Sequence, residues 1–176
     1  MTAPVDEDLR RNWVTVPPLG EMSHPSDVPA RIVPVVTEQA SIEEGLTARI
    51  GHRVRTDDLS IVFGSGAVPV LATPRALAWC EEATVHSIAA VLEAGITSVG
   101  LRVSLDHLKP SVVGTDVFAE AVVDKVEGRR ITFGVKLEDE AGELLATGKV
   151  VRVLVDLERF LTRADDTGQI PVVTPT

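Results

Sequence analysis

The segment from Thr73 to Gly95 limits the fold more than any other part of the chain. Thr73 is a good N-cap, Pro74 suits the first helical position and Gly95 suits a C-terminal stop, so the segment predicts one helix. A stripe at helical spacing runs along it: Leu77, Thr84, Ile88, Val91 and Leu92. At about 1.5 Å per residue this helix is roughly 32 Å long. That is long for a chain of 176 residues, so we expect it to be the central element.

Strand-like segments lie on both sides of the predicted helix. One precedes it at residues 46–55, and four follow it at residues 98–108, 114–128, 129–139 and 144–157. Short turns separate the last three segments, and strands that follow one another through tight turns are antiparallel. The sequence therefore predicts an α+β fold, with one long helix lying on an antiparallel sheet.

The ends of the chain and its charge set further limits. Prolines are concentrated in the first 34 residues, so we interpret 1–44 as an irregular arm, 45–161 as the folded domain and 162–176 as a tail.

The net charge of −9 argues against phosphate-mediated binding to nucleic acid and against binding to an anionic membrane surface. A single cysteine, Cys80, rules out an intramolecular disulfide. With no apolar run typical of a signal peptide or membrane helix, we expect a cytoplasmic protein.

His107 is the most informative single residue. It ends an alternation of apolar residues, Val99, Leu101, Val103 and Leu105, and this pattern predicts that its side chain points toward the helix. Two interpretations stay open. The residue is either a hydrogen-bonded core histidine or a general base that positions water near neutral pH.

Other polar or unusual residues have similar alternatives. Glu81 and Glu82 lie beside the apolar stripe, and periodicity does not choose which of them faces solvent. The hydroxyl of Thr73 would sit beside the free N–H groups of the helix N-terminus, which suits a developing oxyanion as well as a simple cap. Gly100 interrupts a strand, as expected for a β-bulge or for close approach of a ligand. The histidines lack neighbours at metal-ligand spacing, so no metal site is predicted.

Four stretches of sequence together carry a family resemblance. They are LATPRALAWCEEA, with Thr73 eight residues before Glu81; SVGLRVSLDH, with Gly100 seven residues before His107; VEGRR; and the pair formed by Gly148 and Arg152. Residues 46–160 resemble the fluoroacetyl-CoA thioesterase-like branch of the hotdog-fold thioesterases. The resemblance implies a hotdog fold, in which an antiparallel sheet wraps a long central helix. It also implies a homodimer, or a higher even oligomer, formed by pairing edge strands.

The resemblance further implies hydrolysis of an acyl-CoA thioester, with Thr73, Glu81 and His107 as the catalytic set. Thr73 and the helix N-terminus would handle the thioester carbonyl, Glu81 would be nucleophile or base, and His107 would activate water or protonate the leaving thiolate. Gly100 would line the acyl pocket, and Arg152 would organise or bind near the CoA end. No metal or separate cofactor is implied, because CoA is part of the substrate.

This chain also departs from the family pattern. The fluoroacetyl-specific member has a pair of Phe residues in the loop before the helix, and the matching positions here are Gly64 and Ala67. These substrate-contacting positions predict a different or larger acyl group. The alternative function is a non-catalytic hotdog module that binds acyl-CoA or an acyl carrier. A hotdog dehydratase or hydratase fits less well, because adjacent Asp106 and His107 would point to opposite faces of a strand.

Overall fold

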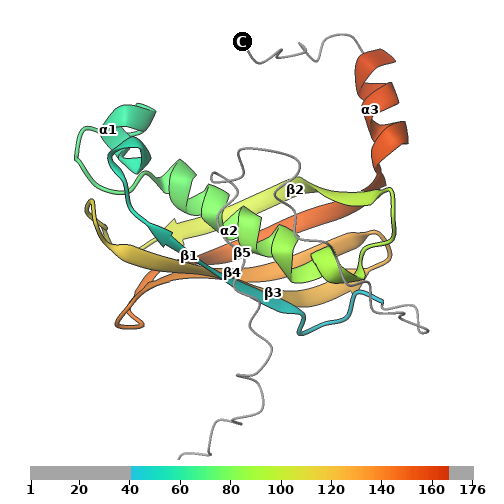
Figure 1. The fold of residues 1–176 in the computed structure, drawn as a ribbon, viewed down its shortest axis with the longest axis horizontal. Helices are drawn as coiled ribbons and strands as arrows, with labels where there is room; N and C mark the ends of the chain where they lie inside the picture. Colours follow the sequence, from blue (N-terminus) through green and yellow to red (C-terminus); the bar gives the residue numbers. More distant parts are fainter. Residues whose placement is uncertain (1–40, 167–176) are drawn as a thin grey trace, which may run out of the picture.

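A computed structural model describes residues 41–166 of the chain (Figure 1). Most of the predicted arm and of the predicted tail lies outside these residues. The elements in chain order are β1 (Thr47–Arg53), η4 (Thr56–Asp58), α1 (Ser60–Phe63), α2 (Thr73–Ile88), η5 (Ala89–Val91), β2 (Ile96–His107), β3 (Asp116–Glu127), β4 (Arg130–Asp139), β5 (Leu144–Asp156) and α3 (Leu157–Asp166). The last helix runs across position 162, where we expected the tail to begin.

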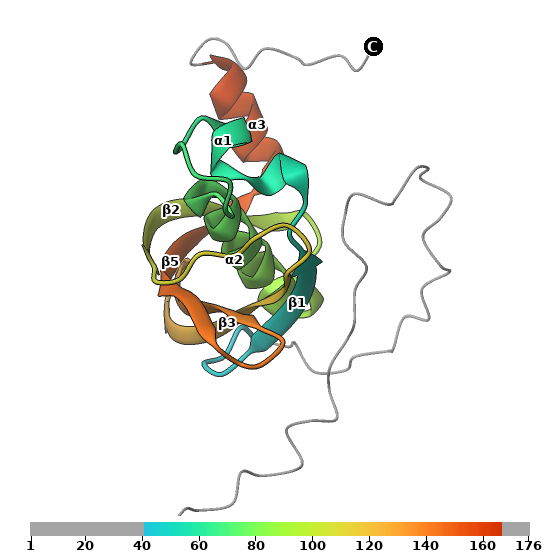
Figure 2. The same cartoon turned by 90° about the vertical axis from the view of Figure 1, so that its left-hand side faces the viewer.

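The five strands form one antiparallel sheet in the order β1-β3-β4-β5-β2. Figure 2 shows the sheet curling around α2, which lies in its concave face. Strands β3 and β4 alternate buried and half-buried residues along most of their length, because one face packs on the helix and the other meets water. The predicted α+β class is confirmed.

The core lies between α2 and the central strands. Helix α2 contributes Trp79, Cys80, Ala83 and Ile88 to it, and the strands contribute apolar side chains such as Phe133, which is fully buried. Of the predicted helical stripe, Thr84 and Ile88 are buried. Val91 and Leu92 lie beyond the helix but still pack partly buried against the core.

Both predicted ends of the helix need correction. Ala72 is the N-cap residue and makes no side-chain cap hydrogen bond, so Thr73 is the first helical residue rather than the cap. The α-helix ends at Ile88, and a 3₁₀ turn replaces the last turn predicted up to Gly95. Near this end the hydroxyls of Thr84 and Ser87 each donate to the carbonyl three residues earlier. Such side-chain bonds compete with the helical ladder and bend helices.

A bulge in β2 overturns the predicted alternation of that strand. Gly100 lies opposite Arg152 of β5, whereas Arg102 lies opposite the preceding residue of β5, so Leu101 is left without a partner. An extra residue reverses which side chains face the helix. Even-numbered residues face α2 before the bulge, and odd-numbered residues face it afterwards. The prediction that Val99 and Leu101 share a face with His107 is therefore wrong, and the bulge suggested by Gly100 is confirmed.

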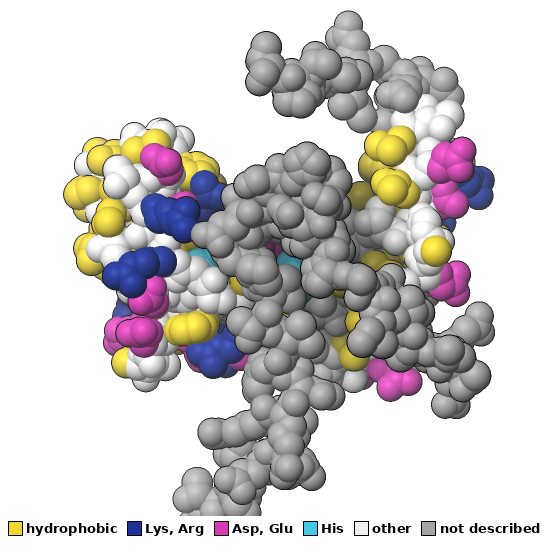
Figure 3. Space-filling view, viewed as in Figure 1, with side chains coloured by type: hydrophobic (Ala, Val, Ile, Leu, Met, Phe, Trp, Pro, Cys, Tyr) yellow, Lys and Arg dark blue, Asp and Glu magenta, His cyan; other side chains and the backbone are white. Residues whose placement is uncertain are grey.

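Exposed large hydrophobic side chains gather in four places along residues 41–166, with Val85 on α2 as the exception. These places are α1 with the loop after it (Ile61, Val62, Phe63, Val68), β2 (Leu101, Val103), the loop after β2 (Leu108, Val112, Val113) and α3 (Leu157, Phe160, Leu161). Figure 3 shows such side chains over α1 and over α3. Strand β2 thus joins two apolar ends of the molecule.

Candidate active site

Thr73 and His107 meet where the start of α2 approaches the end of β2. The Thr73 Oγ1 atom lies 3.0 Å from His107 Nδ1, within hydrogen-bonding distance. Because Thr73 is the first helical residue, its hydroxyl is free to contact the histidine rather than to cap the helix. The pair therefore sits at the positive end of the α2 dipole, beside N–H groups that have no helical acceptor.

The His107 ring is held in its neutral form, which can accept a proton. Burial lowers the pKa of His107 below its ordinary value of 6.5, and the backbone of Lys109 opposes this with a smaller effect. The ring is therefore neutral at pH 7, with one donor and one acceptor nitrogen. Its Nε2 atom is buried and has no hydrogen-bond partner among the described residues. A buried polar atom without a partner is costly unless a bound molecule supplies one.

A pocket of about 350 Å³ opens beside this pair. Its lining is mainly small or apolar and consists of Ser60, Ser65, Gly66, Ala67, Val68, Val70, Leu71, Thr73, His107, Leu108, Lys109 and Pro110. Ala67, predicted to contact substrate, is part of this lining. Gly64, predicted with it, is not; it ends α1 in a left-handed conformation at φ +67°. The pocket has room for an apolar group beside Thr73 and His107.

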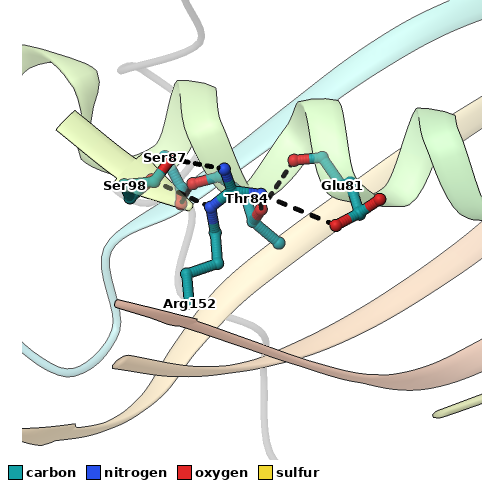
Figure 4. Close-up of polar contacts among 5 residues, drawn as sticks. All are labelled: Glu81, Thr84, Ser87, Ser98 and Arg152. Carbon is teal, nitrogen blue, oxygen red and sulfur yellow. Dashed lines mark hydrogen bonds and ion pairs between the residues drawn. The ribbon is translucent and has the colours of Figure 1, made fainter. Parts of the chain in front are cut away.

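Glu81 belongs to a second group of residues, midway along α2 (Figure 4). Its Oε1 atom lies 3.8 Å from Nη1 of Arg152, and a Cβ at Gly100 would lie 2.9 Å from the same oxygen. Gly100 thus faces the Glu81 carboxylate across a gap that leaves no room for a side chain. The Glu81 side chain remains 35% exposed, so it is open to a further partner.

Arg152 is held in place from β2. Its Nε and Nη2 atoms donate to the side-chain and backbone oxygens of Ser98, each at 2.8 Å, and the residue is only 7% exposed. Burial lowers the pKa of the Arg152 guanidinium, while the negative charge of Glu81 raises it. Arginine stays protonated in proteins, so Arg152 is a fixed positive charge behind the Glu81 carboxylate. Sequence reasoning missed Ser98, which the local pattern does not distinguish from Thr97 and Ser104, the other hydroxyl residues of β2.

Glu82 contacts a different set of residues from Glu81, and neither carboxylate is fully exposed: the side chain of Glu82 is 20% exposed and that of Glu81 is 35% exposed. Its carboxylate lies 3.6 Å from Nε2 of His52 and 4.0 Å from Nε2 of His86. The His52 ring stacks on Trp79 with ring centres 4.6 Å apart. Glu82 therefore faces β1, whereas Glu81 faces β2. Cys80, between Trp79 and Glu81, is inert, since burial and the charge of Glu81 raise its pKa to about 12.

Within one protomer the predicted catalytic residues form two groups. Glu81 follows Thr73 by eight residues, which is about 12 Å along the helix axis. In residues 41–166 no hydrogen bond or ion pair joins the Thr73–His107 pair to the Glu81–Arg152 pair. These residues also contain no group of three or more His, Cys, Asp or Glu placed to hold a metal ion. Their helices include none long and apolar enough to cross a membrane.

Comparison with known proteins shows which family the chain matches. The family model described as "FlK: Fluoroacetyl-CoA-specific thioesterase" matches residues 54–158. The chain belongs to this thioesterase family. The fluoroacetyl-CoA thioesterase of Streptantibioticus cattleyicolor is 32% identical over 91 residues, which are 52% of this chain and 65% of that protein. The matched region thus spans less than two thirds of this relative.

Solved structures confirm the predicted hotdog fold. A hot-dog-like protein from Thermanaerovibrio acidaminovorans superposes with a TM-score of 0.66 at 29% identity, over 72% of this chain and 93% of its own. The fluoroacetyl-CoA thioesterase FlK superposes with a TM-score of 0.68 at 22% identity, over 73% of this chain and 99% of its own. The family resemblance seen in the sequence is therefore confirmed for both fold and family.

Proposed function

We propose that this FlK-family protein hydrolyses an acyl-CoA thioester to the free acid and CoA. The observation that carries the proposal is the Thr73–His107 contact, 3.0 Å long, at the side of a pocket lined by apolar residues. A thioester hydrolase needs a base near neutral pH, donors for the carbonyl oxygen and a place for the acyl chain. The protein groups around this contact supply all three.

The residues take the following roles in the proposed reaction. The Thr73 hydroxyl and the N-terminus of α2 stabilise the negative charge that develops on the thioester oxygen. The neutral His107 imidazole accepts a proton from the attacking water, whose oxygen bonds to the carbonyl carbon. As the carbon–sulfur bond breaks, the imidazolium returns that proton to the CoA thiolate. The Glu81 carboxylate, backed by Arg152, orients the water. The reaction requires neither a metal ion nor a separate cofactor.

A second copy of the chain would unite the two groups of residues. In the part of the chain that the structure describes, β2 pairs on one side only, and its Leu101 is 55% exposed. Free strand edges of this kind are templates for pairing. A twofold antiparallel pairing centred between Val103 and Ser104 would set Gly100 opposite the partner's His107. We therefore propose a homodimer whose sites combine Glu81 of one subunit with the Thr73–His107 pair of the other.

The first test measures CoA release from acyl-CoAs of increasing chain length, including fluoroacetyl-CoA. We expect turnover with a preference for acyl groups larger than fluoroacetyl, because Gly66 and Ala67 leave the pocket open. His107→Ala and Glu81→Ala should abolish turnover in folded protein. Asp106→Ala is the matched control, because its side chain lies on the opposite face of β2. Acyl-CoA binding without turnover in any of these proteins would favour the non-catalytic module.

Mixed subunits test the shared site. If each site uses His107 of one subunit and Glu81 of the other, a dimer of one His107→Ala and one Glu81→Ala subunit keeps one intact site. Random mixing of the two inactive variants should then restore about a quarter of the wild-type turnover. If each site lies within one chain, both sites of every mixed dimer are defective. Absence of any restored turnover in verified mixed dimers would refute the shared arrangement.

A further inference from the structure

Helix α3 carries an apolar face that its own protomer covers only in part. Leu157, Phe160 and Leu161 lie at i, i+3 and i+4, so they share one side of the helix, and Phe160 is 43% exposed. The helix follows β5 directly and rises away from the sheet (Figure 1). The family model ends at residue 158, so most of α3 lies beyond the residues that it matches.

A second exposed apolar surface lies beside the candidate site. It comprises the side chains of α1 and its following loop (Ile61, Val62, Phe63, Val68) and of the loop after β2 (Leu108, Val112, Val113). We call it the α1 surface. Val68 and Leu108 also line the pocket that contains Thr73 and His107. Whatever covers the α1 surface therefore lies at the mouth of the pocket.

The two surfaces cannot meet within one protomer. The amide of Leu157 donates to the carbonyl of Gly95, which places the start of α3 at the beginning of β2. The amide of Leu71 donates to the backbone carbonyl of Ser111, which places the α1 surface at the other end of β2. Strand β2 has 12 residues, so the two surfaces are separated by roughly 40 Å of strand. Both helices rise on the side of the sheet that holds α2 (Figure 2).

A dimer with twofold symmetry would bring the α3 face of one subunit close to the α1 surface of the other. When two β2 strands pair antiparallel, the beginning of each strand lies beside the end of the other. The α3 helix of one subunit then lies next to the α1 surface of the other, on the same side of the joined sheet. Leu101 and Val103, exposed on β2, lie between the two surfaces in the strand that would pair across the axis.

We propose that α3 of each subunit packs its Leu157, Phe160 and Leu161 face onto the α1 surface of the other subunit and covers the mouth of that subunit's pocket. This inference rests on the β2-paired dimer of the proposed function. It assigns to α3, which lies mostly beyond the family match, a role in assembling a neighbouring site. The occupant of the α1 surface is thus a second copy of this chain.

Hydrogen exchange on the full chain tests the proposal, with sedimentation measured in parallel. In the double variant Phe160→Ser and Leu161→Ser, we expect amides in 60–68 and 108–113 to exchange at least about tenfold faster than in the wild type. Amides of β4 should be unchanged, which shows that the protomer is still folded. The control, Glu158→Ser with Arg159→Ser on the other side of α3, should leave both segments unchanged.

The outcomes distinguish the α3 contact from the β2-paired dimer on which it rests. A dimeric wild type whose two segments exchange equally in all three proteins overturns the α3 contact and leaves the β2 dimer intact. A monomeric wild type overturns both. Cross-linking gives an independent result: a Phe160→Cys chain mixed with a Val62→Cys chain should yield a mixed covalent dimer with a short bismaleimide. Neither variant alone should do so, because Cys80 is buried.

Discussion

Replacing Gly100 with alanine should separate catalysis from stability. The new Cβ would lie 2.9 Å from Oε1 of Glu81, and ordinary contacts begin near 3.4 Å, so the carboxylate must move by about half an ångström. The carboxylate ends a flexible side chain and moves easily. Alanine also restricts the unfolded chain, so the free energy of unfolding should change by less than about 1 kcal/mol. Because catalytic groups tolerate little displacement, kcat should fall by about 10- to 100-fold.

Gly134→Ala is a close control for this substitution. Its Cβ would lie 3.0 Å from Oδ1 of Asp124, another carboxylate, but on the outer face of the sheet. Steady-state CoA release gives kcat and KM for both variants, and thermal unfolding gives their stability. Gly134→Ala should retain wild-type kcat. Full kcat in Gly100→Ala, or an equal loss in both variants, would refute the role assigned to the Glu81 carboxylate.

Three further predictions concern stability and pH. Gly148→Ala should lower the melting temperature by about 6 °C, because its Cβ would overlap the Ser104 carbonyl and separate β2 from β5; unchanged melting contradicts this. Burial lowers the pKa of His52 to about 4, so the folded protein favours the neutral ring. The contribution of this neutral ring to the free energy of unfolding is fully present above pH 6.5 and is lost as the pH falls toward 4. Allowing for solvent screening, this contribution is about 2 kcal/mol. The variant His52→Phe, whose ring can still stack on Trp79, should lose this pH dependence of the free energy of unfolding, as measured by denaturant titration at several pH values. Since burial lowers the pKa of His107, the acid limb of kcat/KM should have its midpoint below 6.5, and a midpoint above 6.5 would show that the neutral ring is not the base.

The helix and most strands of the sheet could be predicted from local sequence patterns, because the formation of a helix or a strand depends largely on neighbouring residues. Pro74 and the alternating segments predicted α2 and four strands after it, and the structure places these elements at nearly the predicted residues. The helix ends were less accurate. The preference of Thr73 for a cap is worth about 1 kcal/mol, and tertiary contacts of similar size, here with His107, are enough to shift it by one residue.

The site was harder to predict because its geometry depends on pairing between distant strands. Gly100 and His107 are an odd number of residues apart, so in a regular strand they would face opposite sides of the sheet. The bulge at Leu101 turns both toward α2, and it is visible only in the pairing of β2 with β5. Periodicity likewise left Glu81 and Glu82 equivalent. Glu81 faces Arg152 and Gly100, and Glu82 faces His52, because β2 and β5 lie on one side of the helix and β1 on the other.

What the sequence by itself determined is the set of elements, the α+β class and the residue types available for chemistry, since spacing and turn residues act over a few positions. What only the tertiary structure decided is which of those residues meet. It joins Thr73 to His107 and Glu81 to Arg152, and it leaves the two pairs apart within one protomer. The physical reason is that strand register, a single bulge and the curl of the sheet act over the whole domain, where no local pattern records them.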